Sequence, residues 1–244
     1  TEYLNKALHD IIREAGNNPE TPVANAFKLL TLHLDSTSMS ELMRQVMSKR
    51  SLLKSIINHH GDNLVQKLYE VLEIEQGATE QSIIDKLKHT YEKNKFKVAI
   101  EALLQGSDKD KERAQIIAEW LERGNNFKEY KSVFITNKNE VTKKMPTKAV
   151  VAVYPEIIDL FIREGEKLLE VSEKLKALKQ VELNEALLML ASSMLGRYEI
   201  YKANCDKLDY DDLIIKTSSL LAEKSMVPWV LYKLDSGIDH ILVD

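Results

Sequence analysis

The chain has 244 residues, of which 44% are hydrophobic and 30% are charged, a balance that is typical of a folded globular protein. Its formal net charge of −4 excludes a polycation that coats nucleic acid, so any nucleic-acid contact would need a local basic patch. The single cysteine, Cys205, excludes an intramolecular disulfide and argues against a zinc or iron–sulfur site with Cys ligands. No apolar run approaches the roughly 18 residues of a membrane span, and we expect no membrane partner.

The first half of the chain has the spacing of apolar residues that is typical of short amphipathic helices. The first helix ends at the sequence GNNP, and Thr21 followed by Pro22 predicts the start of the second. Ser38 with Glu41 three residues later has the pattern of a capping box, which predicts a third helix through about Lys49. Further helices are expected near residues 51–58, 61–74, 79–92, 95–104 and 108–123.

Residues 131–153 differ in composition from the segments around them. SVFIT is rich in β-branched and aromatic residues and NKNE is a turn signal, so we expect a small β-hairpin here. The segment has a local net charge of +4, because Glu140 is its only acid. Its five lysines are Lys131, Lys138, Lys143, Lys144 and Lys148.

Two helices of more than 20 residues are predicted next, over residues 156–179 and 182–205, and we expect them to form an antiparallel pair. A helix to about Glu223 and a short one after Pro228 follow. Residues 240–243, HILV, have the composition of a buried strand. The predicted fold is mostly α: an irregular multi-helix bundle with a small β-excursion near 131–153 and an orphan C-terminal strand.

Common motifs of nucleotide and hydrolase sites are absent from the sequence. It contains no GxxxxGKS or GxxxxGKT phosphate loop, no GxGxxG, no GxSxG and no HExxH. The residues alone therefore show no complete catalytic site, and they leave open whether the chain is an enzyme.

The sequence LDYDDLI, residues 208–214, concentrates acids at the start of a predicted helix. Asp209 with Asp212 three residues later suits a helix N-terminus, where a side chain caps the first turn and negative charge is favourable. Asp209, Asp211 and Asp212 could instead ligate a metal ion, as in a metal-dependent phosphohydrolase. The terminal HILVD has a related ambiguity, since an Asp after a buried strand is common in α/β proteins and also occurs in the Walker B strand of ATPases.

Taken together and in this order, the two motifs resemble those of UvrD/Rep-type superfamily-1 DNA helicases, in which an Asp-aromatic-Asp-Asp-Leu helix precedes the Walker B strand. The sequences WVLYKLDSGIDHILVD and YKSVFITNKNEVTKKMPTK look most similar to the AddA-type helicase–nuclease subunit of double-strand-break repair. The resemblance implies that residues 1–205 are a helical insertion domain, called 1B. Residues 206–244 would return into the RecA-like ATPase domain 1A and end at the Walker B strand. The chain would then be a fragment of a longer protein.

The resemblance also implies roles for individual residues. Asp244 matches the Walker B position that helps to hold Mg²⁺, while the catalytic Glu expected next is not in the chain. The residues Asp209, Tyr210, Asp211 and Asp212 match the helix motif, where a structural role is expected. ATP and Mg²⁺ would be cofactors of the full-length parent, with none expected for this chain, which would not be catalytically competent alone. The implied partners are DNA and a second subunit of a helicase–nuclease complex, in the bacterial cytoplasm with the nucleoid.

The lysine-rich segment has two interpretations. It could contact DNA phosphates, with Lys138, Lys143, Lys144 and Lys148 as the candidate residues. The interpretation that we favour for the segment alone is a solvated hairpin whose lysines protect its edges. For the chain as a whole, the alternative to a helicase fragment is a free-standing all-α domain for protein interaction or scaffolding.

Overall fold

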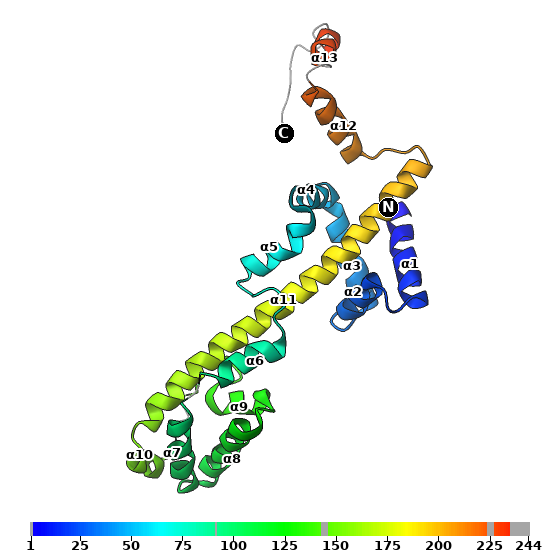
Figure 1. The fold of residues 1–244 in the computed structure, drawn as a ribbon. Helices are drawn as coiled ribbons and strands as arrows, with labels where there is room; N and C mark the ends of the chain where they lie inside the picture. The colour runs from blue at the N-terminus through cyan, green and yellow to red at the C-terminus, as the bar shows by residue number, and fades with distance from the viewer. Residues whose placement is uncertain (1, 91, 143–145, 224–226, 235–244) are drawn as a thin grey trace. The chain divides into compact units, whose positions relative to one another are not determined.

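The computed structural model describes residues 2–90, 92–142, 146–223 and 227–234, and in these ranges the chain is almost entirely helical, which confirms the mostly α prediction (Figure 1). A 3₁₀ turn, Gly61–Asn63, joins α4 to α5. None of the helices in these ranges combines the length and the apolar character needed to cross a membrane. The helices are α1 (Glu2–Asn17), α2 (Pro22–Thr31), α3 (Ser36–Ser48), α4 (Arg50–His60), α5 (Leu64–Val71), α6 (Glu80–Lys88), α7 (Lys93–Leu104), α8 (Asp108–Arg123), α9 (Phe127–Phe134), α10 (Lys148–Val153), α11 (Ile157–Asn204), α12 (Tyr210–Ala222) and α13 (Val227–Leu234).

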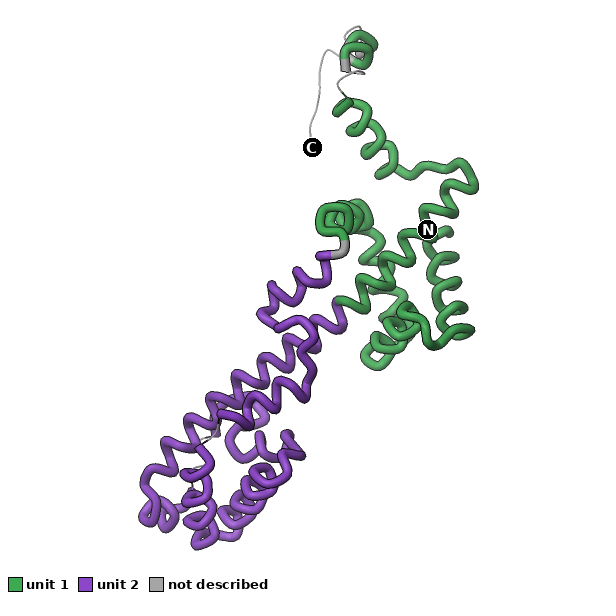
Figure 2. The backbone as a smooth tube through the Cα atoms, viewed as in Figure 1, with its two compact units in different colours: residues 1–61, 185–244 green, residues 62–184 purple. Residues whose placement is uncertain are grey.

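The chain divides into two compact units, coloured separately in Figure 2. The first unit comprises residues 1–61 and 185–244, and the second comprises residues 62–184. Helix α11 contributes to both, because its first part lies in the second unit and its last part in the first. The domain boundary that the resemblance implies, between residues 205 and 206, follows the end of α11 and stays a prediction.

Helix α11 corrects the expectation of two antiparallel helices. The structure has one continuous helix of 48 residues, Ile157–Asn204, where helices over 156–179 and 182–205 were predicted. The intervening sequence, KQVELN, contains neither Gly nor Pro, and Val181 is fully buried in helical conformation. Nothing in this stretch stops a helix, so the chain continues without a turn.

The expected β-hairpin near 131–153 is also largely wrong. Residues 131–134 belong to α9, residues 148–153 form α10, and the β-structure reduces to one antiparallel bridge between Ile135 and Val141. Phe134 is fully buried, so its packing against the core overrides the β propensity of the surrounding residues. The predicted strand at 240–243 lies outside the described residues.

Local capping signals decide where several helices begin. Thr21 caps α2 as predicted, accepting a hydrogen bond from the Ala24 N–H. The predicted capping box of Ser38 and Glu41 is wrong, because α3 begins earlier, at Ser36. Asp35 is its N-cap and accepts the Ser38 N–H at 2.7 Å. Asp accepts this bond as well as Ser does, so the helix starts at the first good cap in the sequence.

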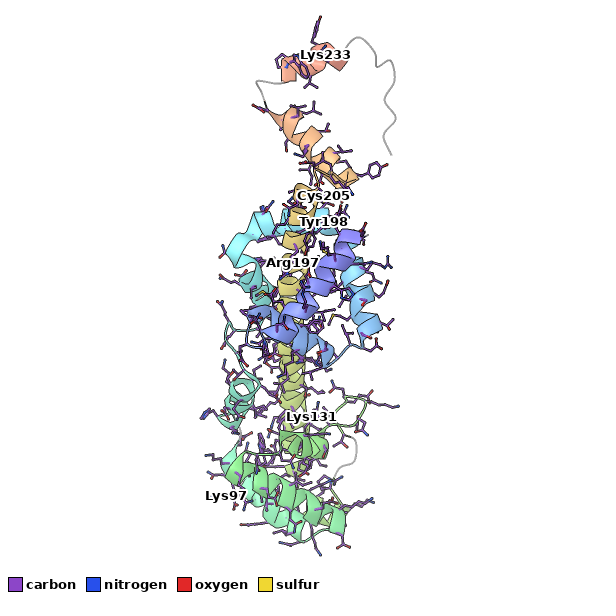
Figure 3. All side chains as sticks on the ribbon, turned by 90° about the vertical axis from the view of Figure 1, so that its right-hand side faces the viewer. Lys97, Lys131, Arg197, Tyr198, Cys205 and Lys233 are labelled. Carbon is purple, nitrogen blue, oxygen red and sulfur yellow. The ribbon has the colours of Figure 1, made fainter. Side chains whose placement is uncertain are left out.

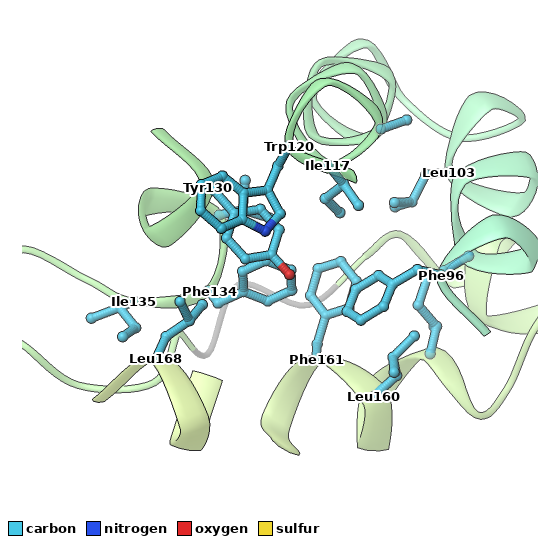
Figure 4. Packing of buried hydrophobic residues seen from close by; sticks show 14 of the residues in the cluster. Phe96, Leu103, Ile117, Trp120, Tyr130, Phe134, Ile135, Leu160, Phe161 and Leu168 are labelled. Carbon is cyan, nitrogen blue, oxygen red and sulfur yellow. The ribbon is translucent and has the colours of Figure 1, made fainter. Parts of the chain in front are cut away.

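The core of the second unit is built around aromatic rings (Figure 4). Trp120 of α8 stacks on Tyr130 of α9, with ring centroids 4.8 Å apart. Phe134 meets Phe161 of α11 at 4.9 Å and Phe96 of α7 at 6.3 Å. These contacts fix α7, α8 and α9 on the first part of α11, since aromatic pairs bury large areas in a defined geometry.

The first unit has an aliphatic core instead. Met39, Met43 and Met47 recur every fourth residue along α3 and are at most 4% exposed, forming a buried methionine row. Helix α1 is tied to the last part of α11 by polar contacts from Asp10 to Tyr201 and from Glu14 to Arg197. This unit carries the acidic motif of residues 208–214.

Candidate functional site

The acidic motif begins α12 as predicted. Asp209 has extended backbone angles and is the N-cap, and its carboxylate accepts the Asp212 N–H at 2.9 Å. The Asp212 carboxylate accepts the Asp209 N–H in return, also at 2.9 Å. This reciprocal capping box satisfies two N–H groups that a helix start would otherwise leave without partners.

Two cations from other helices surround these acids. Lys202 of α11 is only 4% exposed, and its Nζ lies 2.7 Å from Asp212 Oδ2 and 3.2 Å from Asp209 Oδ2. Arg50, the first residue of α4, lies 2.7 Å from Asp211 Oδ2 and 3.3 Å from Asp209 Oδ2. We call Arg50, Tyr198, Lys202, Asp209, Asp211 and Asp212 the aspartate cluster.

Tyr198 completes the cluster from α11, one helical turn before Lys202, and is labelled in Figure 3. Its hydroxyl donates to Asp209 Oδ2 at 2.7 Å. Lys202 Nζ lies 4.7 Å from the centre of its ring, and the Arg50 guanidinium lies 5.8 Å from it. The ring face therefore adds a cation–π contact to each of the two cations.

Contacts within the cluster shift the pKa values of Asp209, Lys202 and Tyr198. Burial opposes ionisation of Asp209, but hydrogen bonds from the Asp212 N–H, the Tyr198 hydroxyl and the Lys202 ammonium outweigh it, and the pKa of Asp209 is lowered. Burial likewise opposes the charge of Lys202, yet hydrogen bonds to Asp212, Asp209 and Glu199 raise its pKa. Burial and the bond to Asp209 raise the pKa of Tyr198 to about 12. None of these groups is poised to exchange a proton near neutral pH.

A metal site at these aspartates finds no support in the geometry. The carboxylates of Asp209, Asp211 and Asp212 already accept bonds from Lys202 or Arg50. The space between the cluster residues is about 10 Å³, room for one water at most. In the part of the chain that the structure describes, no group of three or more His, Cys, Asp or Glu side chains is arranged to hold a metal ion.

Tyr210, the remaining motif residue, is 85% exposed and stands apart from the cluster. The apolar residues that follow it in α12 are exposed as well, and no described residue of this helix is buried. The exposed members are Leu213, Ile214, Ile215, Leu220 and Leu221. Helix α12 is thus fixed at its first turn by charge and hydrogen bonds, with little apolar packing along its length.

The predicted lysine patch is only partly described. Lys138 and Lys148 are exposed, whereas Lys131 is half-buried and its Nζ lies 3.4 Å from Asn139 Oδ1. Lys143 and Lys144, like the predicted magnesium ligand Asp244, lie outside the described residues. The described part of the chain therefore contains none of the residues that the resemblance assigns to Mg²⁺ or ATP.

Sequence reasoning missed the cationic half of the aspartate cluster. The spacing of Tyr198 and Lys202 places both on one face of α11, and a lysine in line with buried residues such as Leu195 was a usable signal. Arg50 gave no such signal, because it reaches the cluster from a helix far away in the sequence.

No protein-family model, no curated protein and no solved structure matches this chain.

Proposed function

We propose that this chain is the helical insertion domain, with the start of the return into the ATPase domain, of an AddA-like, UvrD-type DNA helicase. Its parent would couple ATP hydrolysis to movement along single-stranded DNA during double-strand-break repair. The chain would contribute a DNA-contacting surface and hydrolyse no ATP alone. The capping box at Asp209 supports this proposal most directly, because it gives the motif residues the structural role that the resemblance implies.

The exposure of α12 also supports the proposal. Helix α12 has 13 residues, and five of its Leu and Ile side chains are exposed while none is buried. Such an exposed apolar surface is typical of a helix that packs against a further partner. In the proposed parent, this helix would pack within ATPase domain 1A, which would cover those side chains. The aspartate cluster would then set the position at which the chain leaves the insertion.

DNA binding provides the test. We expect the purified chain to bind a labelled 30-nucleotide oligo-dT strand without sequence preference. Three phosphate contacts would weaken this binding about 20-fold between 50 and 200 mM salt. Replacing Lys143 and Lys144, or Lys138 and Lys148, by Glu should lower the affinity, as measured by fluorescence anisotropy. The matched control is Lys109→Glu with Lys111→Glu, two exposed lysines of α8. Absence of DNA binding at 50 mM salt would contradict the proposal.

A free-standing helical interaction domain is the second candidate, and the aromatic core of the second unit favours it. The buried residues of that core all lie within residues 84–168, and the partly buried ones packed against them lie in the same unit. The candidate predicts a cooperative thermal transition together with no DNA affinity at low salt. Salt-sensitive DNA binding that the lysine variants weaken would exclude it as the sole function.

A further inference from the structure

The end of α6, the start of α7 and residues between them line a hollow of about 610 Å³ in the surface of the second unit. Its lining combines three lysines, a histidine and an amide with one acid. These residues are Lys88, His89, Glu92, Lys93, Asn94 and Lys95. Residues 86–97 contain five lysines and a single acid, so this segment has a formal charge of +4. That equals the charge of the patch predicted from sequence at residues 131–153.

The one acid of the hollow is already neutralised. Glu92 forms an ion pair with Lys95, and Arg163 of α11 lies 3.7 Å from its other oxygen. The hydrogen bond from Lys95 lowers the pKa of Glu92, which keeps it ionised and paired. Lys88 is paired with Asp85, which lies outside the lining, at 2.7 Å. Lys93 is exposed and forms no ion pair with any described residue, so the excess positive charge of the hollow is centred on Lys93.

Three described residues at or beside the lining make contacts with the rest of the second unit. Phe96, next to Lys95, is 1% exposed in the aromatic core. Lys167 of α11 donates to the Thr90 carbonyl at 3.1 Å. Lys88 lies over the Trp120 ring, with its Nζ 5.6 Å from the ring centre. These contacts anchor Lys88, Thr90 and Phe96, so less freedom is lost at these three residues when an anion binds.

Gly124 makes room for Lys88. A Cβ at this position would lie 2.5 Å from the Lys88 Cε, and the residue has the left-handed φ of +62° that favours glycine. The end of α8 therefore leaves room for the Lys88 side chain, whose Nζ pairs with Asp85 at 2.7 Å.

We propose that this hollow seats backbone phosphates of single-stranded DNA, and the inference rests on the proposed function. Its lining is polar and positive, and Lys97, labelled in Figure 3, continues the positive charge one turn further along α7. A strand with a charge at every nucleotide matches such a series of lysines, whereas a single small anion would meet only part of it.

A second cavity in the same unit shows the contrast. This cavity of about 320 Å³ has an apolar floor that includes Ile74, Ile83 and Val171. Its rim balances three lysines with three glutamates, so it has no preference for a polyanion. Of these two cavities, only the hollow has the charge that DNA requires.

The test compares two double variants with equal changes in net charge. Lys93→Glu with Lys95→Glu should weaken binding of the 30-nucleotide oligo-dT strand at least tenfold and flatten its salt dependence. The control, Lys109→Glu with Lys111→Glu, should change the affinity less than twofold. Both should keep the circular dichroism of the parent chain, because Lys93, Lys109 and Lys111 are exposed and Lys95 is half-buried. Lys93→Glu alone, which breaks no ion pair with a described residue, should weaken binding in the same direction.

A chemical footprint gives a second readout that needs no substitution. Oligo-dT should protect Lys93 and Lys95 from acetylation relative to Lys109 and Lys111, and inorganic phosphate at equal phosphate concentration should not. Equal protection by inorganic phosphate would show a site for free anions and overturn the assignment to DNA.

The outcomes separate this inference from the proposed function. If the Lys93 and Lys95 variant binds DNA normally while the Lys138 and Lys148 variant does not, the hollow is not a DNA site and the proposed function stands. If the unaltered chain binds no DNA, both are overturned.

Discussion

Lys202 in the first unit and Glu164 in the second are buried to a similar degree, with 4% and 1% exposed, yet their surroundings differ. Lys202 has three acidic partners within 3.2 Å, namely Glu199, Asp209 and Asp212. Glu164 accepts a hydrogen bond from the Tyr130 hydroxyl at 2.8 Å, and Lys167 Nζ lies 3.7 Å from its Oε2. Lys202 therefore has three oppositely charged partners close by, whereas the charged partner of Glu164 lies further away.

Both pKa values are raised, but the rise keeps Lys202 charged and favours the neutral form of Glu164. Hydrogen bonds to its acids raise the pKa of Lys202 despite burial, so the ammonium stays charged. For Glu164, burial dominates over the bond from Tyr130 and raises the pKa of its carboxyl, which favours the neutral acid. Burial alone does not decide the charge state of a group; the number of partners that can stabilise the charge does.

The largest expected effect comes from removing the ammonium of Lys202. Lys202→Met should destabilise the first unit by about 3 kcal/mol, because it leaves the acids of a buried ion pair without their cation. Hydrogen exchange should show loss of protection at the start of α12 and the end of α11.

The control for this variant is Lys54→Met. Lys54 is 40% exposed and lies 3.6 Å from Glu199, so its loss should cost less than about 1 kcal/mol. Equal effects of the two substitutions would show that the aspartate cluster adds no more stability than a surface ion pair.

A change of pH should affect the two units in opposite directions. The lowered pKa values of Asp209 and Asp212 give the first unit stability that is present above about pH 4 and lost in stronger acid. The raised pKa of Glu164 gives the second unit a contribution that is present below its ordinary value of 4.5 and lost as pH rises through the raised value. Denaturant titrations at pH 2 and pH 4 measure the first trend, and titrations at pH 4 and pH 8 measure the second.

Trp120 reports the second unit in this experiment once the exposed Trp229 is replaced by Phe. In that background, Glu164→Gln should stabilise the second unit by about 1 kcal/mol at pH 8 and much less at pH 4, since it removes an ionisable group from a buried site. A stabilisation that does not vary with pH would rule out ionisation of Glu164 as the cause.

The two glycines of α11, one in each unit, differ in the room around them. A Cβ at Gly165 would lie 2.8 Å from Val141 Cγ1, whereas a Cβ at Gly196 would meet nothing within 4 Å. Gly196→Ala should therefore stabilise the first unit by about 1 kcal/mol through helix propensity. Gly165→Ala should lower the melting temperature of the second unit, because Val141 pairs with Ile135 and must move. Stabilisation by both substitutions would contradict this contrast.

The features that the sequence predicted correctly are local ones. Two helix starts were predicted correctly, at Thr21 before Pro22 and at Asp209 before Asp212. Each is readable from the sequence because the cap and the group that it caps lie within one helical turn. The predicted break in α11 was wrong because residues 179–184, between the two predicted helices, contain no Gly or Pro that would stop a helix. The predicted hairpin failed because Phe134 gains more from the aromatic core than from a strand.

The candidate site likewise has a part that local sequence shows and a part that depends on the tertiary fold. Its acidic half was visible in LDYDDLI, whereas Arg50 and Lys202 come from other helices and meet the acids only after folding. The hollow at α6 and α7 was not predicted, although KLKHTYEKNKFK shows its lysines, because adjacent charges in a sequence do not reveal whether they share one surface.

The buried methionine row of α3 has a kinetic consequence. Peroxide oxidises a methionine only when its sulfur reaches solvent, so Met39, Met43 and Met47 can react only while the first unit is open. Met189, 40% exposed in the same unit, reacts without any opening and gives the reference rate. Mass spectrometry can follow both oxidation rates. The ratio of the rate of the buried methionine row to that of Met189 then measures how often the first unit opens.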